Sequence, residues 1–240
     1  MKKYIDKVTV TGTSDDTSYD DMIAIQKEYP FVEWGILLSR SQAGRSWRFP
    51  SMEWLQKCQW DDTQLNMSGH LCGKFVNEIL MGDRENADLR WNLNWHFKRI
   101  QINTHGIKHK WDKTKFFSEI LEKYPNIQFI FQYDEANKNI VEETQAAGYK
   151  NISALYDLSH GAGVLPAEWN PPLEELYTGY AGGLSPDNLE SQLKILDQVA
   201  SNEVIWIDAE THLRSNGDQI FDLDKVVKFL EIAKSRIINS

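Results

Sequence analysis

The stretch Tyr177-Thr-Gly-Tyr-Ala-Gly-Gly-Leu-Ser-Pro-Asp-Asn188 contains one complete strand-to-helix unit. It begins with a short β-type segment, passes through two glycines, and then shows the signals of a helix start. Ser185 is a good N-cap, and Pro186 suits the first helical turn, where its missing N–H is not needed. The apolar residues that follow are spaced to form one buried helix face: Leu189, Leu193, Leu196 and Val199. The stretch therefore predicts a strand, a glycine turn and a helix, in that order.

The glycine turn of this unit is also a candidate binding site. Gly182 and Gly183 lack a Cβ atom, so a ligand oxygen can approach their backbone N–H groups closely. Amides at such a turn, and at the helix start behind it, favour an anion. One interpretation is a phosphate seat formed by Gly182, Gly183 and Ser185. The alternative is a plain strand-to-helix turn that needs glycine only for its backbone angles.

The same unit recurs along the chain. Seven further short segments are apolar or β-branched and are bounded by turns: 7–11, 31–38, 65–70, 99–104, 127–131, 152–156 and 203–207. Helical patterns follow nearly all of them, and strands that alternate with helices through short connections are typical of a parallel sheet. Eight units in 240 residues predict an α/β fold, the (β/α)8 TIM barrel, which is usually about 250 residues long. An open doubly wound sheet is the alternative, although no G-x-G-x-x-G motif follows the first strand.

The composition is that of a folded globular chain with 41% hydrophobic and 25% charged residues, enough for a substantial core. We expect one barrel domain over residues 1–240, with residues 82–97 as a candidate insertion, because their charged, tryptophan-containing sequence fits no strand or helix pattern clearly. The formal net charge of −9 argues against a nucleic-acid partner, which would require clustered Lys and Arg.

The cysteines and the apolar runs bear on the cellular compartment. Cys58 and Cys72 are the only cysteines, too few for a disulfide scaffold, which favours a reducing cytoplasm. The N-terminal residues lack the apolar core of a signal peptide, and no apolar run approaches the roughly 20 residues of a membrane span. We therefore expect a cytoplasmic protein without a membrane partner, either a monomer or a homodimer.

Polar residues stand where the predicted strands end. In barrels of this kind the active site lies at the carboxyl ends of the strands. Those ends are far more polar than the strands before them: Thr11, Arg40, His70, His105, Gln132 with Asp134, Asp157, Gly182 with Gly183, and Asp208 with Glu210. Carboxylates and imidazoles beside an anion seat suit general acid–base chemistry on a phosphorylated small molecule. Each also has a structural interpretation: Asp157 suits a turn cap, and His70 and His105 suit hydrogen bonds within the fold.

The loop 39–50 is basic in an otherwise acidic chain. Its arginines Arg40, Arg45 and Arg48 suit a bidentate clamp on a carboxylate or phosphate, or alternatively a solvated surface loop. Arg40 and Arg48 are the candidate ligand-binding residues of this loop.

Metal binding receives little support from the sequence. His70 with Cys72, and His105 with His109, have partial metal-ligand character. Neither pair has a third ligand at a recognisable spacing, so we expect no metal and no cofactor.

Several motifs carry a resemblance to a known family. Ala181-Gly-Gly-Leu-Ser-Pro-Asp-Asn188 is similar to the strand-seven phosphate motif of phosphoribosylanthranilate isomerases, which are (β/α)8 barrels. Asp157-Leu-Ser-His-Gly-Ala-Gly163 resembles their strand-six segment, and Gln101-Ile-Asn-Thr-His-Gly106 resembles a stretched form of their strand-four motif. Phe221-Asp-Leu-Asp-Lys-Val226 is in keeping with their last helix. The resemblance runs from about residue 99 to the C-terminus.

The resemblance implies roles for individual residues. Asp157 would be the general acid, and Gly161 and Gly163 would belong to the glycine-rich loop after it. Gly182, Gly183 and Ser185 would hold the phosphate of the substrate. No cofactor is implied.

The departures from the family pattern concern the reaction itself. The family's general base is a cysteine in a Cys-Gly pair after the first strand, where this chain has Thr11-Gly12. A threonine hydroxyl is a far weaker base than a thiolate, so Glu210 or His105 would have to replace it. The family's Ser-Pro-Arg after strand two is Ser39-Arg40 here, in a longer loop. After strand eight, the family has a Ser-Ser-Gly segment whose amides bind phosphate. This chain has residues 208–212 there, which contain two carboxylates.

Two function classes follow from these observations. The first is an isomerase-type enzyme that acts by acid–base chemistry on a phosphorylated, sugar-like small molecule. The second is a non-catalytic barrel that binds, senses or sequesters a phosphorylated metabolite or nucleotide, which the threonine at position 11 favours. A purely structural protein would leave the polar strand ends without a role.

Overall fold

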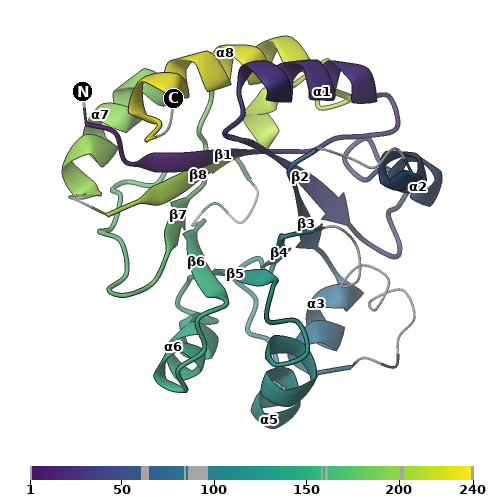
Figure 1. Ribbon diagram of the computed structural model, residues 1–240, viewed down its shortest axis with the longest axis vertical. Coiled ribbons are helices and arrows are strands. Elements are labelled where there is room, and N and C mark those ends of the chain that lie inside the picture. The colour runs from purple at the N-terminus through teal and green to yellow at the C-terminus, as the bar shows by residue number, and fades with distance from the viewer. Residues whose placement is uncertain are drawn as a thin grey trace.

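Eight parallel strands form a closed barrel. The computed structural model describes residues 2–60, 65–83, 85, 97–157, 159, 162–200 and 203–238. Each strand pairs with the next in chain order and the last pairs with the first, as Figure 1 shows. The strands are β1 (Ile5–Thr11), β2 (Val32–Leu38), β3 (Met67–Leu71), β4 (Arg99–Ile102), β5 (Gln128–Gln132), β6 (Ile152–Tyr156), β7 (Thr178–Tyr180) and β8 (Ile205–Ala209). The predicted barrel is therefore confirmed.

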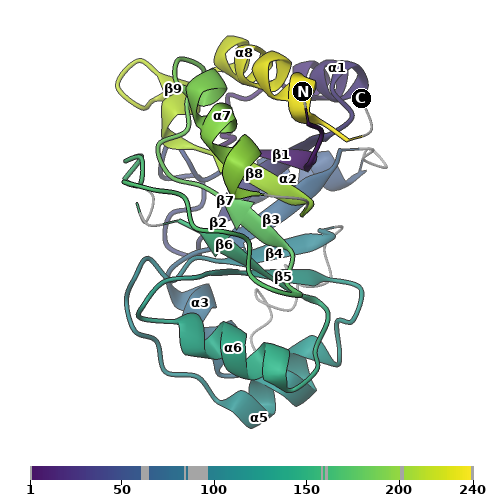
Figure 2. The ribbon, with the colours of Figure 1, turned by 90° about the vertical axis from the view of Figure 1, so that its left-hand side faces the viewer.

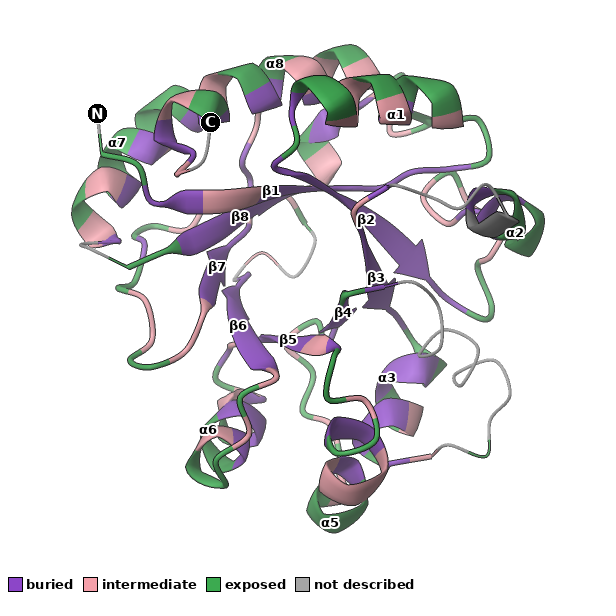
Figure 3. Ribbon diagram, viewed as in Figure 1, coloured by how far each residue is buried: buried purple, intermediate pink, exposed green. Residues whose placement is uncertain are grey.

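Helices surround the barrel, as the turned view in Figure 2 shows. They are α1 (Tyr19–Glu28), α2 (Met52–Trp60), α3 (Lys74–Leu80), α5 (Lys113–Lys115), α6 (Lys138–Ala146), α7 (Leu189–Val199) and α8 (Leu223–Ala233). In α8 the buried residues Val226, Phe229, Leu230 and Ala233 follow the spacing of one helix face. Figure 3 shows buried residues along the strands and exposed residues on the outer side of α1 and α8. Among the described helices, none has the length and apolar character needed to cross a membrane.

The structure differs from the sequence-based boundaries at two helices. The α7 helix begins at Leu189 with Asn188 at its cap position, three residues later than the predicted cap at Ser185. Ser185 Oγ instead accepts a hydrogen bond from the Asn188 N–H (3.2 Å), while Asn188 Oδ1 accepts one from the Ser185 N–H (2.9 Å). These bonds close a turn before the helix. The apolar spacing of Phe116, Phe117, Ile120 and Leu121 predicts one helix over 111–124, and the structure has α5 followed by a π-helical turn at Phe116–Leu121.

Two long segments separate described elements: 81–98 between α3 and β4, and 157–177 between β6 and β7. Most of the candidate insertion at 82–97 lies outside the described residues, since only 82, 83, 85 and 97 are described. Between β6 and β7, the described residues contain no helix, so this connection is a long loop. That loop runs against the turn of Gly182 and Gly183, because a Cβ atom on Gly183 would lie 2.4 Å from the Leu165 nitrogen.

The interior of the barrel contains a buried ion pair. Arg99 Nη1 donates to Glu33 Oε1 (2.8 Å), and Thr9 Oγ1 donates to the same oxygen (2.8 Å). The guanidinium of Arg99 lies over the Trp206 ring, 4.2 Å from its centroid. Trp206 fits because Gly179 faces it, where a Cβ atom would come within 2.1 Å of the indole. Barrels of this class usually fill this space with branched apolar residues, so the interior here is unusually polar.

Candidate active site

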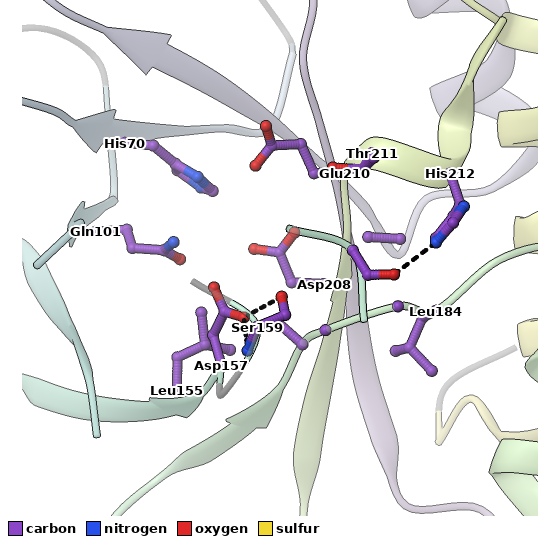
Figure 4. Close-up of a pocket in the computed structure, with 15 residues that line it drawn as sticks. His70, Gln101, Leu155, Asp157, Ser159, Leu184, Asp208, Glu210, Thr211 and His212 are labelled. Atoms are coloured by element: carbon purple, nitrogen blue, oxygen red, sulfur yellow. Dashed lines mark hydrogen bonds between the residues drawn. The ribbon is translucent and has the colours of Figure 1, made fainter. Parts of the chain in front are cut away.

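A pocket opens at the carboxyl ends of the strands. It has an empty volume of about 400 Å³, which includes open solvent at its mouth, and its walls come from β3, β4, β6 and β8 and from the segments that follow β6, β7 and β8. Figure 4 shows the carboxyl groups of Asp157, Asp208 and Glu210, with His70 and Gln101, pointing toward one central space. The other lining residues are Leu155, Ser159, Gly163, Ala181, Gly182, Gly183, Leu184, Ala209, Thr211 and His212. Barrel closure thus brings together residues that are far apart in the sequence.

The glycine turn forms one wall of this pocket. Gly182 and Gly183 both take left-handed backbone angles, with φ of 104° and 68°, which favour glycine. No hydrogen bond within the described chain uses the N–H of either residue, whereas the Ala181 N–H before them donates to the Tyr156 carbonyl (2.8 Å). The turn therefore presents unused donors at the pocket wall. Gly163, from the β6–β7 loop, lines the same pocket.

Asp157 is held by a fixed set of donors. Its Oδ2 accepts from Gln132 Nε2 (3.0 Å), and its Oδ1 accepts from the Ser159 N–H (3.2 Å) and hydroxyl (2.8 Å). The Gln132 amide has a fixed orientation, because its oxygen accepts from the His105 N–H (2.7 Å). Every described partner of Asp157 is therefore a donor.

Asp208 lies at the bottom of the pocket beside Thr11. Its side chain is buried, and Thr11 Oγ1 donates to its Oδ1 (3.1 Å). Burial, and next the charge of Glu210, raise the pKa of Asp208 well above the ordinary aspartate range, against the hydrogen bond from Thr11. Thr11 does not line the pocket itself. It contacts the ligand space only through Asp208.

Glu210 stands at the rim and is paired with Arg48. Arg48 Nη1 donates to Glu210 Oε1, and its Nε and Nη2 bind both oxygens of Asp218 (2.8 Å each). Burial raises the pKa of Glu210, and the charge of Arg48 opposes that rise. Arg48 thus ties the β2–α2 loop to the loop that follows β8.

Several predicted site residues lie away from the pocket lining. Arg40 is paired with Glu78 (2.9 Å) on the surface. Ser185 is engaged with Asn188 in the turn before α7. His105 is exposed, with a positive φ of 51°, and its backbone N–H donates to the Gln132 side chain that binds Asp157. Gly161 lies outside the described residues.

His70, one of the polar strand ends named from the sequence, lines the pocket together with three side chains that were not proposed as site residues: Gln101, Ser159 and His212. Burial, and next the charge of Arg99, lower the pKa of His70 to about 3, so its ring is neutral; its Nε2 lies 3.0 Å from Ser68 Oγ. His212 Nε2 lies 2.7 Å from the Gly163 carbonyl oxygen, which requires a proton on that nitrogen. Gln101 and Ser159 complete the set. In the sequence, His70 and Gln101 stand out as polar residues within strands. That position could have pointed to a functional role, because strand residues that face inward are usually apolar.

Nucleophilic and metal chemistry find little support in the described residues. Burial raises the pKa of the Cys72 thiol to about 12, so a thiolate is disfavoured. Within the ranges that the structure describes, no cluster of three or more His, Cys, Asp or Glu is arranged to hold a metal ion.

Replacing Arg48 with methionine is expected to raise the pKa of Glu210 further, because the cation that favours its charged form is removed. The matched control is Arg45→Met, which removes the same charge from an exposed position of the same loop. Carbon-13 NMR titration of the glutamate carboxyls measures the effect, with the Glu210 signal assigned through Glu210→Gln. Equal Glu210 titration curves in the two arginine variants would contradict the pairing.

Comparison with known proteins finds similarity in structure and not in sequence. No protein-family model matches the chain, and no curated protein sequence matches it. The fold is similar to that of a monomeric form of dimeric phosphoribosylanthranilate isomerase from Thermotoga maritima, with a TM-score of 0.56 and 15% identity over 95% of this chain and 98% of that one.

Two further solved structures match over nearly the whole length of both chains. N-(5'-phosphoribosyl)anthranilate isomerase from Pyrococcus furiosus has a TM-score of 0.55 and 12% identity, over 96% of this chain and 99% of its own. The structure of 3-hexulose-6-phosphate synthase from Salmonella typhimurium has a TM-score of 0.54 and 10% identity, over 96% of this chain and 99% of its own. The resemblance to phosphoribosylanthranilate isomerases is thereby confirmed for the fold and extends along nearly the whole chain. At such low identity the likeness concerns the fold alone.

Proposed function

We propose that this barrel binds a phosphorylated, sugar-like small molecule and changes it by acid–base chemistry of the isomerase type. The observation that carries the proposal is one shared pocket, in which unused glycine N–H groups and carboxyl groups line the same space. Amide donors at one end and proton-exchanging groups at the other suit a substrate with a phosphate and a reactive carbon–oxygen centre. The names of the three structural neighbours also include phosphoribosyl and hexulose-6-phosphate groups.

The phosphate end of the pocket relies on N–H donors. Gly182 and Gly183 offer their amides, and Gly163 lines the same pocket without a side chain, at a position where a Cβ atom would lie 3.1 Å from Thr211. No lysine or arginine belongs to the described pocket lining. Recognition would therefore depend on the direction of hydrogen bonds more than on charge attraction.

Two of the three carboxyl groups in the pocket, Asp157 and Glu210, lie in different surroundings. All described partners of Asp157 are donors, which favours Asp157 as a group that accepts a proton. The family resemblance assigns it the opposite role of general acid. The raised pKa of Glu210 improves it as a proton acceptor, and Arg48 keeps its charged form accessible.

A non-catalytic, ligand-binding barrel is the second candidate. Thr11 stands where the related enzymes have their basic cysteine, and its hydroxyl is already donated to Asp208. A barrel that kept the amide seat without a working base would bind a phosphorylated metabolite and leave it unchanged.

Calorimetry with ribose 5-phosphate and with ribose tests the binding step. The phosphate ester is expected to bind at least about tenfold more tightly than ribose, a difference of about 1.4 kcal/mol. NMR then follows aldose and ketose phosphates and phosphoribosylanthranilate for conversion. Binding without conversion of any of them supports the second candidate. Failure to bind any phosphorylated compound would exclude both.

Asp157→Asn is expected to lower turnover by about 10²- to 10⁴-fold while the phosphorylated ligand still binds, because an amide cannot accept the proton. Glu135→Gln is the control, since it neutralises a carboxylate with a side chain 91% exposed. Steady-state kinetics of both variants give the comparison. If the two variants turn over equally, Asp157 has no part in the reaction.

The proposal keeps the cellular location and the partners that the sequence predicts. Cys58 and Cys72 form no disulfide bond, in keeping with a cytoplasmic location. We expect a monomer or homodimer with a small-molecule ligand and without nucleic acid.

A further inference from the structure

Asp208 occupies the centre of the pocket floor with one oxygen engaged. Thr11 donates to its Oδ1, and no described residue hydrogen-bonds its Oδ2. Its side chain is only 5% exposed, and Figure 4 shows its carboxyl directed into the space between Asp157 and Glu210. Oδ2 is therefore available to a ligand that enters the pocket.

The charges around Asp208 are unbalanced. Three carboxylates act on it from neighbouring elements: Glu33 of β2, Asp157 after β6, and Glu210 after β8. The nearby cations are committed elsewhere, since Arg99 is paired with Glu33 and Arg48 with Glu210 and Asp218. His70 is neutral, the charge of His105 acts on Glu210, and His212 Nε2 faces the Gly163 carbonyl oxygen. A fourth negative charge at this buried position would have no compensating cation.

We propose that Asp208 holds a proton and donates it through Oδ2 to an oxygen atom of the ligand, with Thr11 as the residue that positions it. This inference rests on the proposed function and names the proton donor of the same site. A protonated Asp208 also lowers the negative charge beside the glycine amides, which favours an anionic phosphate there. Thr11 thus serves the site through its neighbour in the adjacent strand.

The proton exchange balances without any other reactant. The O–H bond of Asp208 breaks as a ligand carbonyl oxygen gains the proton, and the bonding pair stays on Asp208 as a carboxylate. Asp157 takes a proton from the carbon next to that carbonyl, which leaves an enediol. Asp157 then returns its proton to the former carbonyl carbon, and Asp208 recovers one from the hydroxyl on the other carbon of the enediol, which becomes the new carbonyl. Both residues regain their starting states, and the ligand is an isomer of the substrate.

Carbon-13 NMR of aspartate-labelled protein tests the protonation without any ligand. The Asp208 carboxyl signal, assigned by its loss in Asp208→Asn, is expected to titrate at a pH where ordinary aspartates, with a pKa of about 3.9, are fully ionised. Thr11→Val keeps the β-branched shape and removes the donor, so the Asp208 signal is expected to titrate at still higher pH. A signal that titrates in the ordinary range would overturn the inference and leave the proposed binding function untouched.

Kinetics and binding supply the second readout. Asp208→Asn is expected to bind ribose 5-phosphate as wild type does and to lose about 10²-fold or more in turnover of the active substrate. It should also lose one limb of the pH–rate profile. Asp224→Asn, at an exposed position of α8, is the control. If Asp208→Asn retains both the rate and the pH profile, Asp208 is not the donor, whether or not it is protonated.

The stability of the protein gives a check on folding. A carboxyl group whose pKa is higher in the folded than in the unfolded state stabilises the fold fully at pH values below its unfolded-state pKa. This contribution is lost as the pH rises through the folded-state pKa. Wild type should therefore lose more stability than Asp208→Asn as pH rises above about 3.9, while Asp224→Asn follows wild type. Parallel pH dependence in wild type and Asp208→Asn would argue against the buried proton.

Discussion

Replacing Arg99 with methionine is expected to lower the free energy of unfolding by about 3 to 5 kcal/mol, the usual effect of leaving one charge of a buried pair alone. Arg99 Nη1 lies 2.8 Å from Glu33 Oε1, and the two side chains are 6% and 1% exposed. Methionine keeps an apolar chain over Trp206, so the loss should come mainly from the stranded Glu33 charge. Arg99 Nε and Nη2 have no partner among the described atoms, which favours the lower end of the range. Urea unfolding measures the difference.

Two further variants separate charge from packing. Glu33→Gln in the Arg99→Met background removes the stranded charge and is expected to recover most of the lost stability. Lys113→Met breaks an exposed pair with Glu143, whose side chains are 50% and 45% exposed, and should cost less than about 1 kcal/mol. A loss in Arg99→Met no larger than in Lys113→Met would mean that the interior pair does not stabilise the barrel.

This ion pair illustrates which parts of the fold the sequence could predict. The alternation of strands and helices is a local pattern, so all eight strands could be located within a few residues. Glu33 appears in the sequence as one charge within an apolar segment, and Arg99 as a charge at the start of another. Their pairing across 66 positions depends on the register of β2, β3 and β4, which local patterns do not contain.

The candidate site likewise has parts that the sequence could predict and parts that it could not. The rule that barrel sites lie at strand ends placed Asp157, Glu210 and the glycine turn at one face, and the structure brings them into one pocket. Side-chain direction in loops is set by tertiary partners, so Arg40 turned out to pair with Glu78 on the surface. The contact of Asp208 with Thr11 requires β8 to lie beside β1, which only barrel closure provides.

Replacing Gly183 with alanine is expected to have the largest effect on ligand binding. The residue has a φ of 68°, where an L-residue costs roughly 1 to 2 kcal/mol. A Cβ atom would also lie 2.4 Å from the Leu165 nitrogen, a backbone atom that must move, and overpacking of this kind costs about 1 to 3 kcal/mol. The β6–β7 loop and the glycine amides should shift together, and loss of one amide hydrogen bond to a charged phosphate, about 1.5 to 3 kcal/mol, weakens binding roughly 10- to 100-fold.

Gly217→Ala is the matched control for the backbone angle. Gly217 has a similar φ of 62°, but nothing lies within 4 Å of a Cβ atom there, so only the conformational cost of about 1 to 2 kcal/mol should appear. Affinity for ribose 5-phosphate should stay unchanged in this variant and fall in Gly183→Ala. Gly182→Ala, whose Cβ would meet the Val164 oxygen at 3.2 Å, is the milder variant to use if Gly183→Ala does not fold. A folded Gly183→Ala or Gly182→Ala protein with wild-type affinity would show that the phosphate does not bind at this turn, because either Cβ atom would press on the β6–β7 loop and displace the turn whose amides are proposed to hold it.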